Sequence, residues 1–143
     1  MEIRNQVKMS IQSLSENVGI ARITAAAFAA QLDFTLNEIE EIKVAISEAI
    51  SNAVIHAYGH PDGIIEFTMN LYDDKVEYII TDIGKGIEDI NLARQPSYST
   101  DPERMGLGFV FMESFMDELD ILSKQGQGTT VMMAKKFQSN VAH

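Results

Sequence analysis

Cysteine is absent from the 143 residues, which excludes disulfides, thiol catalysis and cysteine-based metal sites. Histidine is scarce, and His56, His60 and His143 do not have the spacing of metal ligands. No apolar run approaches the ~20 residues of a membrane-spanning helix, and the N-terminus lacks the apolar segment of a secretory signal. Together these absences predict a cytosolic protein without a membrane partner.

Positive charge is also scarce, because 11 Lys and Arg stand against 21 Asp and Glu and give a formal net charge of −10. Phosphate backbones require clustered Lys and Arg, so direct binding to nucleic acid is not expected. The acidic balance has two interpretations: it suits a basic protein partner, or it only keeps the chain soluble.

Apolar residues, by contrast, are plentiful enough for a folded core. Hydrophobic residues make up 45% of the chain and only 3 residues are proline, which predicts an ordered globule. The length is that of one domain, so we expect residues 1–143 to form a single unit.

The spacing of the apolar residues predicts helices interleaved with hairpins. Alternation around Val7, Met9 and Ile11 predicts a first strand. A helix is expected from an N-cap at Ser15 to about residue 32, and another from the capping box 35–38 to about residue 57. The remaining expected elements are strands at 65–71 and 76–80, a helix at 109–116, and strands at 119–123 and 129–136. This order predicts a two-layer α/β sandwich with helices on one face of a mixed, mostly antiparallel sheet.

The second predicted helix carries a polar seam. Glu48, Asn52 and His56 recur every fourth residue and lie between two apolar faces. One face is a row of isoleucines, and Val44 and Ile55 lie roughly opposite that row, so we expect this helix to be buried on two sides. A carboxylate and an amide in a partly buried seam require a partner, and Mg²⁺ with its waters is one candidate. The alternative is a solvated or helix-to-helix polar stripe.

A glycine-rich turn follows the strand that ends near Thr81. Asp82 can accept a hydrogen bond from an exocyclic amine, while Gly84 and Gly86 let a ligand ring approach the backbone. An ordinary turn that leaves a strand is the alternative.

Two further glycine motifs follow a stretch from 84 to 104 that has no helical or strand period, as functional lids and disordered loops do. Gly106 and Gly108 open a helix whose free N–H groups form a potential phosphate site, and Arg104 can add a charge-assisted contact. In Gly128-Thr-Thr130, a hydroxyl, which we assign to Thr130, can reach a base or a bridging water. Each motif alone is common in ordinary turns.

The order and spacing of these four motifs resemble the ATP-binding fold shared by gyrase B, Hsp90, histidine kinases and MutL, the Bergerat-type fold. In that family they correspond to the N box, two glycine boxes and a terminal Gly-Thr, and residues 87–105 would form an ATP lid. A Walker-type NTPase is not supported, because no P-loop is present.

A more specific resemblance covers nearly the whole chain. It rests on residues 21–28, 47–58, 93–96 and 108–117, which are similar to the anti-sigma F factors, serine kinases of endospore-forming bacteria. The resemblance implies a homodimer that binds and inhibits a sporulation sigma factor with ATP present. It also implies ATP-dependent phosphorylation of one serine on a small anti-anti-sigma protein, which releases that antagonist.

The resemblance also implies residue roles. Glu48 matches the general base that takes the serine proton, Asn52 the Mg²⁺ ligand, and Asp82 the residue that contacts the adenine amine. The backbone at the second glycine box would hold phosphates beneath the lid, where Arg104 could meet the γ-phosphate. Arg22 matches an arginine of the first helix that contacts both protein partners.

Three other interpretations remain open. A paralogous stress-response anti-sigma kinase would share the fold and the chemistry with a different sigma partner. An ATP-gated binding module would capture partners without catalysis, although Glu48, the expected base, is present. An isolated histidine-kinase catalytic domain is disfavoured, because we expect no histidine-bearing dimerisation helix and His56 lies inside the predicted ATP-binding helix.

Overall fold

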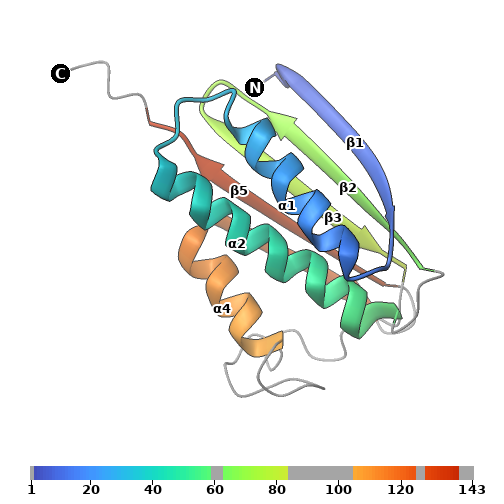
Figure 1. Cartoon of the computed structure of the whole chain (residues 1–143). Coiled ribbons are helices and arrows are strands. Elements are labelled where there is room, and N and C mark those ends of the chain that lie inside the picture. The colour runs from blue at the N-terminus through green and yellow to red at the C-terminus, as the bar shows by residue number, and fades with distance from the viewer. Residues whose placement is uncertain (1, 59–62, 84–104, 125–127, 139–143) are drawn as a thin grey trace.

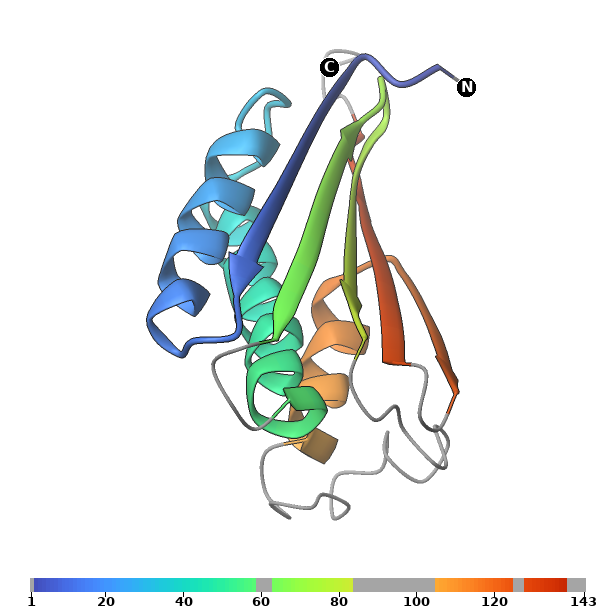
Figure 2. The ribbon, with the colours of Figure 1, turned by 90° about the vertical axis from the view of Figure 1, so that its right-hand side faces the viewer.

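A computed structural model describes residues 2–58, 63–83, 105–124 and 128–138. A five-stranded sheet forms one layer, and helices cover one of its faces (Figures 1 and 2). The elements are β1 Asn5–Gln12, α1 Glu16–Ala29, α2 Leu36–Asn52, a π-helix Ala53–Tyr58, β2 Ile64–Leu71, β3 Lys75–Asp82, α4 Met105–Phe115, β4 Glu118–Lys124 and β5 Gly128–Lys136.

The sheet has the order β1-β2-β3-β5-β4, and all four neighbouring pairs are antiparallel. The predicted two-layer α/β sandwich is therefore confirmed. Its sheet is purely antiparallel over the described strands, rather than mixed, because β3 and β5, which are separated in the sequence by α4 and β4, also run in opposite directions.

The alternation of β3 shows which face of the sheet carries the core. Val76, Tyr78 and Ile80 are buried beneath the helices, while the residues between them are half-buried on the opposite face. The Tyr78 hydroxyl donates a 2.8 Å hydrogen bond to the Ala25 carbonyl of α1 and so joins the two layers. Asp82 continues this inward row at the end of the strand, where it is 6% exposed.

The predicted capping box starts α2. Thr35 Oγ1 accepts from the Glu38 amide at 3.1 Å, and the Glu38 carboxylate accepts from the Thr35 amide at 2.9 Å. The inward isoleucines of α2 have no exposed surface. The expectation that α2 is buried on two sides is wrong, because Val44 and Ile55 are 37% and 41% exposed. The neighbours α1 and α4 lie along the flanks of α2 and leave its outward face uncovered (Figure 1).

Three helix boundaries also differ from their predictions. Ser15 stands at the N-cap of α1 but makes no capping hydrogen bond, since its own backbone is already helical, and α1 ends at Ala29. Regular α2 ends at Asn52, where the π-helix takes over. Helix α4, which the sequence predicted to begin at residue 109, begins at Met105.

The predicted loop 84–104, with nearly all of the lid expected at 87–105, lies outside the described residues. Met105, the last residue of that expected lid, is the first residue of α4. Within the described part of the chain, none of the helices is long and apolar enough to cross a membrane.

Candidate functional site

The C-terminal end of α2 presents Glu48 and Asn52 on one face, one helical turn apart, and both side chains are half-buried. The helix changes from α to π hydrogen bonding directly after Asn52, a change that often occurs at functional sites. Asn52 Nδ2 is buried and has no hydrogen-bond partner. A buried donor without an acceptor is costly, so this amide is suited to hold a bound group.

The first turn of α4 packs directly against these two side chains. A Cβ atom at Gly108 would lie 3.1 Å from Glu48 Oε2 and 3.2 Å from Asn52 Nδ2, which is tighter than ordinary van der Waals contact. Glycine at this position therefore lets the helix start lie close to the polar pair. Because the first N–H groups of a helix have no intrahelical partners, this contact places anion-binding groups beside Glu48 and Asn52.

The adjacent ends of β3 and β5 form the second half of the site. Asp82 and Thr129 are directly opposite each other in the strand register and both are buried. Gly128 has a φ of +96°, and a Cβ there would collide with the Asp82 carbonyl oxygen and lie 2.8 Å from Ile83 Cα. Only glycine allows this close approach, which fixes the backbone around Asp82.

The two threonines after Gly128 lie on opposite faces of the sheet. Thr129 shares the inner face with Asp82, and its Oγ1 is 2.7 Å from Ser123 Oγ of β4. Thr130, the residue selected from the sequence, lies on the outer face, 3.2 Å from the hydroxyl of Thr81. Sequence reasoning missed Thr129, although the inward residue Val131 two positions later indicates the phase of this strand.

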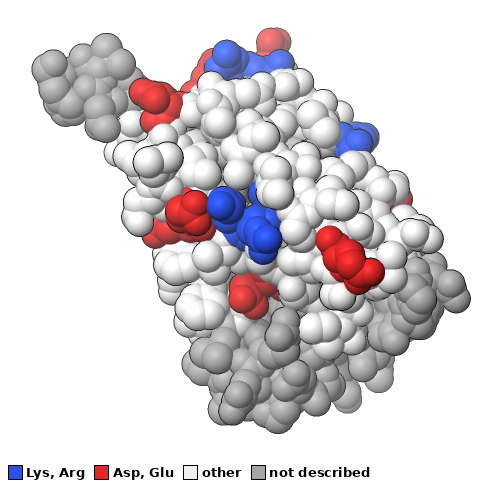
Figure 3. Space-filling model, viewed as in Figure 1, with Lys and Arg blue, Asp and Glu red and all other residues white. Residues whose placement is uncertain are grey.

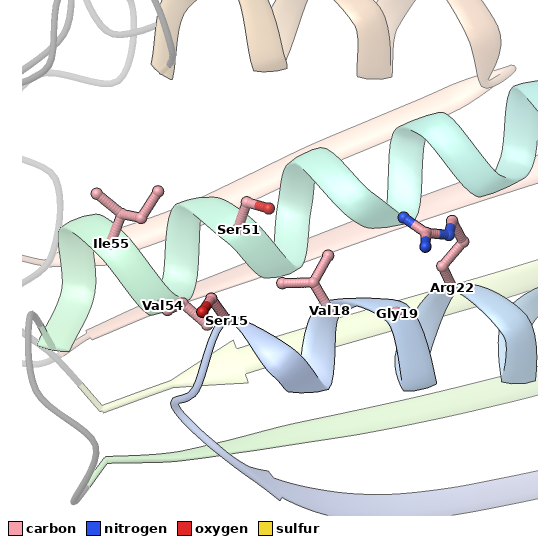
Figure 4. Close-up of a pocket in the computed structure, with 7 residues that line it drawn as sticks. All are labelled: Ser15, Val18, Gly19, Arg22, Ser51, Val54 and Ile55. Carbon is pink, nitrogen blue, oxygen red and sulfur yellow. The ribbon is translucent and has the colours of Figure 1, made fainter.

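Arg22 lies on the other flank of α2. Its Nη1 is 3.4 Å from Ser47 Oγ, and it lines a pocket of about 320 Å³ between α1 and α2. Figure 4 shows Arg22 extending from α1 toward α2 at one end of this pocket, with Val18 pointing from α1 toward α2 and Ser51 on α2. Basic side chains gather where these helices adjoin, with acidic ones around them (Figure 3).

The structure thus brings together two groups of predicted residues: Glu48 and Asn52 with Gly108, and Asp82 with the terminal Gly-Thr. Gly106 is the second residue of α4. Gly84, Gly86 and Arg104 lie outside the described residues.

A magnesium ion fits the first group. In the described ranges, no cluster of three or more His, Cys, Asp or Glu side chains could form a metal site. Mg²⁺ does not need such a cage, since it usually keeps several waters and takes one or two protein oxygens together with substrate phosphates. The side-chain carbonyl oxygen of Asn52 can provide one such ligand, since Oδ1 lies beside the start of α4, 3.6 Å from the position of a Cβ at Gly108, while the buried Nδ2 remains a donor for a phosphate oxygen.

Comparison with known proteins identifies the class first. Residues 11–135 match the family model of the histidine kinase-like ATPase domain, and the chain belongs to that family. Two solved structures share its fold at low sequence identity. The RsbU and RsbW domains of Rv1364c from Mycobacterium tuberculosis give a TM-score of 0.63 at 20% identity, covering 94% of this chain and 33% of that one. The mycobacterial sensor histidine kinase MprB gives 0.57 at 16% identity, covering 90% and 97%.

Curated relatives then identify the particular family. An anti-sigma F factor of Anoxybacillus flavithermus is 46% identical over 143 residues, 98% of each chain. Those of Pasteuria penetrans and Caldanaerobacter subterraneus are 48% and 46% identical, each covering more than nine-tenths of both chains. The chain belongs to the anti-sigma F factor family, and the resemblance inferred from its motifs is confirmed.

Proposed function

We propose that this protein is an ATP-dependent anti-sigma factor that inhibits a sporulation sigma factor and phosphorylates a serine of its anti-anti-sigma antagonist. The relatives named anti-sigma F factor match this chain over 98% of their length, which supports this proposal. The observation that carries it is the contact between Gly108 and the pair Glu48 and Asn52. This contact joins a carboxylate, an amide and a helix N-terminus in one place.

The adenine end of the site is assigned to Asp82 and Thr129. The Asp82 carboxylate accepts a hydrogen bond from the exocyclic amine of adenine. Thr129, the register partner of Asp82 on β5, presents a second polar group to the adenine. Thr129 takes the role first assigned to Thr130, because it shares the inner face with Asp82. Gly84 and Gly86 remain the predicted approach for the ring.

The phosphate end of the site lies between α2 and α4. Backbone N–H groups of the first turn of α4, which contains Gly106 and Gly108, bind phosphate oxygens. Asn52 holds Mg²⁺, which neutralises phosphate charge when bound. Arg104 is predicted to contact the γ-phosphate.

Glu48 is proposed as the general base. The serine oxygen of the partner attacks the γ-phosphorus while its proton passes to the Glu48 carboxylate, and the bond from phosphorus to the ADP oxygen breaks. Phosphoryl transfer depends mainly on position and charge neutralisation, so one carboxylate and a set of oriented donors suffice.

Protein partners are proposed to contact the helical layer around Arg22. The pocket beside it combines a guanidinium with apolar side chains, which suits a partner segment that carries both a carboxylate and an apolar residue. We expect the active form to be a homodimer in the cytoplasm, without direct nucleic-acid binding.

Transfer of labelled phosphate from ATP-Mg²⁺ to a purified anti-anti-sigma protein tests the catalytic proposal. Glu48→Gln should abolish transfer while ATP binding persists. Glu40→Gln is a matched control, because Glu40 lies on the same helix in an exposed pair with Lys43. If the wild type binds ATP and the sigma factor but transfers no phosphate, the protein is an ATP-gated binding module and the kinase proposal fails.

A further inference from the structure

The face of α2 that carries Glu48 and Asn52 has a second polar contact at its other end. Glu41, Ala45, Glu48 and Asn52 follow one another at intervals of four, three and four residues, so they lie on one side of the helix. Ala45, in the middle, is fully buried. The N-terminal part of α4 meets this face at Glu48 and Asn52, through Gly108.

Lys135 of β5 makes the contact at the other end. Although charged, it is only 7% exposed, in the inward row of a strand that also contains Met133. Its Nζ donates to Glu41 Oε1 at 3.0 Å and to the Phe115 carbonyl oxygen at 2.5 Å. Phe115 is the last residue of α4, so Lys135 satisfies a carbonyl that has no intrahelical partner and places a cation at the negative end of the helix dipole.

A single ammonium group therefore joins the C-terminal end of α4 to α2. The opposite end of α4 has little freedom, since the gap at Gly108 is too small for a methyl group without displacement. At 1.5 Å per residue, α4 is about 16 Å long and behaves as a rigid rod. A displacement of its C-terminal end therefore also changes the position of its N-terminal end. Burying the ammonium group of Lys135 in this strand costs free energy, and an apolar side chain of similar size would fill the same space without that cost. The charge therefore calls for an explanation other than packing.

We propose that Lys135 is a positioning residue for the nucleotide site. By clamping the end of α4 to Glu41, it holds the first turn of α4 at the distance from Glu48 and Asn52 that phosphate binding requires. The effect on nucleotide binding rests on the proposed function, whereas the effect on α4 does not.

Two measurements on the full chain test this role. Hydrogen exchange without nucleotide should be at least fivefold faster in residues 105–116 of Lys135→Met than of the wild type. The affinity for a fluorescent ATP analogue should fall about fivefold to twentyfold. Lys75→Met is the matched control, since it removes a partly buried ion pair with Glu118 that joins β3 and β4 and involves neither α2 nor α4. It should leave both quantities within twofold of the wild type.

A conservative pair of variants separates positioning from packing. Glu41→Gln keeps the size of the side chain and weakens only its bond to Lys135, so it should shift both quantities in the same direction by a smaller factor. Lys135→Arg should restore part of the affinity that Lys135→Met loses. If Lys135→Met does not fold, Glu41→Gln decides the question.

The proposal is overturned if a folded Lys135→Met keeps the wild-type exchange rate of α4 and the wild-type affinity for the ATP analogue. If Lys135→Met does not fold, the proposal is overturned when Glu41→Gln leaves both quantities unchanged. A wild type that binds no ATP analogue contradicts the proposed function instead, and the exchange measurement then decides the positioning of α4 by itself.

Discussion

Adding one methyl group at Gly108 tests the geometry of the site directly. In Gly108→Ala the new Cβ lies 3.1 Å from Glu48 Oε2 and 3.2 Å from Asn52 Nδ2, so α4 or these side chains must move by a few tenths of an ångström. Crowding of this kind costs about 1–3 kcal/mol. Alanine recovers about 1 kcal/mol through its higher helix propensity. The net change in the free energy of unfolding should therefore be a loss of about 0–2 kcal/mol.

Nucleotide affinity should suffer more than stability does. The methyl group lies between the phosphate-binding turn of α4 and the side chains of Glu48 and Asn52. Any relaxation that relieves the crowding moves this turn away from those side chains. We expect a loss of at least tenfold in ATP affinity, which corresponds to about 1.4 kcal/mol. Urea unfolding measures the free energy of unfolding, and titration calorimetry with ATP-Mg²⁺ measures the affinity for ATP.

Gly19→Ala provides the control for helix propensity. Gly19 lies within α1, where a Cβ would make ordinary contact at 3.5 Å with the guanidinium of Arg22. This variant should gain up to about 1 kcal/mol of stability and bind ATP like the wild type. If Gly108→Ala also binds ATP with wild-type affinity, the contact between α4 and the polar pair does not form part of the nucleotide site.

Three further predictions concern the strands. Gly128→Ala should lower the free energy of unfolding by about 1–3 kcal/mol in urea, because alanine is strained at a φ of +96° and its Cβ collides with the Asp82 carbonyl. Thr129→Val should weaken ATP binding about tenfold in calorimetry, a loss of about 1.4 kcal/mol. Thr130→Val should change the ATP affinity less than twofold, because only Thr129 shares the inner face with Asp82. Burial raises the pKa of Tyr78, so its contribution to stability is complete below the unfolded-state pKa of about 10 and is lost as the pH rises above it. Tyr78→Phe should therefore flatten the alkaline decline of stability in urea titrations at pH 9–11.

The parts of the fold that depend on local chemistry could be predicted from the sequence. The start of α2 follows from the capping box at Thr35 and Glu38, which satisfies its own hydrogen bonds. The hairpin of β2 and β3 follows from the alternation of apolar residues along its two strands. Both signals are complete within a few residues and need no distant partner.

The features that were missed depend on contacts between distant segments. Periodicity identifies an apolar side of a helix but not what covers it, and so the exposure of Val44 and Ile55 was not foreseen. The start of α4 contains two glycines, whose propensity cost of about 1 kcal/mol each disfavours a helix. The helix forms there nonetheless, and only the contact of Gly108 with α2 reveals why glycine is needed. Lys135 gave no local signal of its contact with Glu41 and Phe115.

The geometry of α2 suggests how one helix can serve both proposed activities. Ser47 and Glu48 are adjacent, and successive residues of an α-helix are about 100° apart around its axis. One therefore faces Arg22 on the α1 side, while the other faces Gly108 on the α4 side. A partner that contacts the surface around Arg22 lies against the same turn of backbone that holds the proposed base. Partner capture and phosphate transfer then share a rigid element, with the partner on one flank of α2 and the nucleotide phosphates on the other.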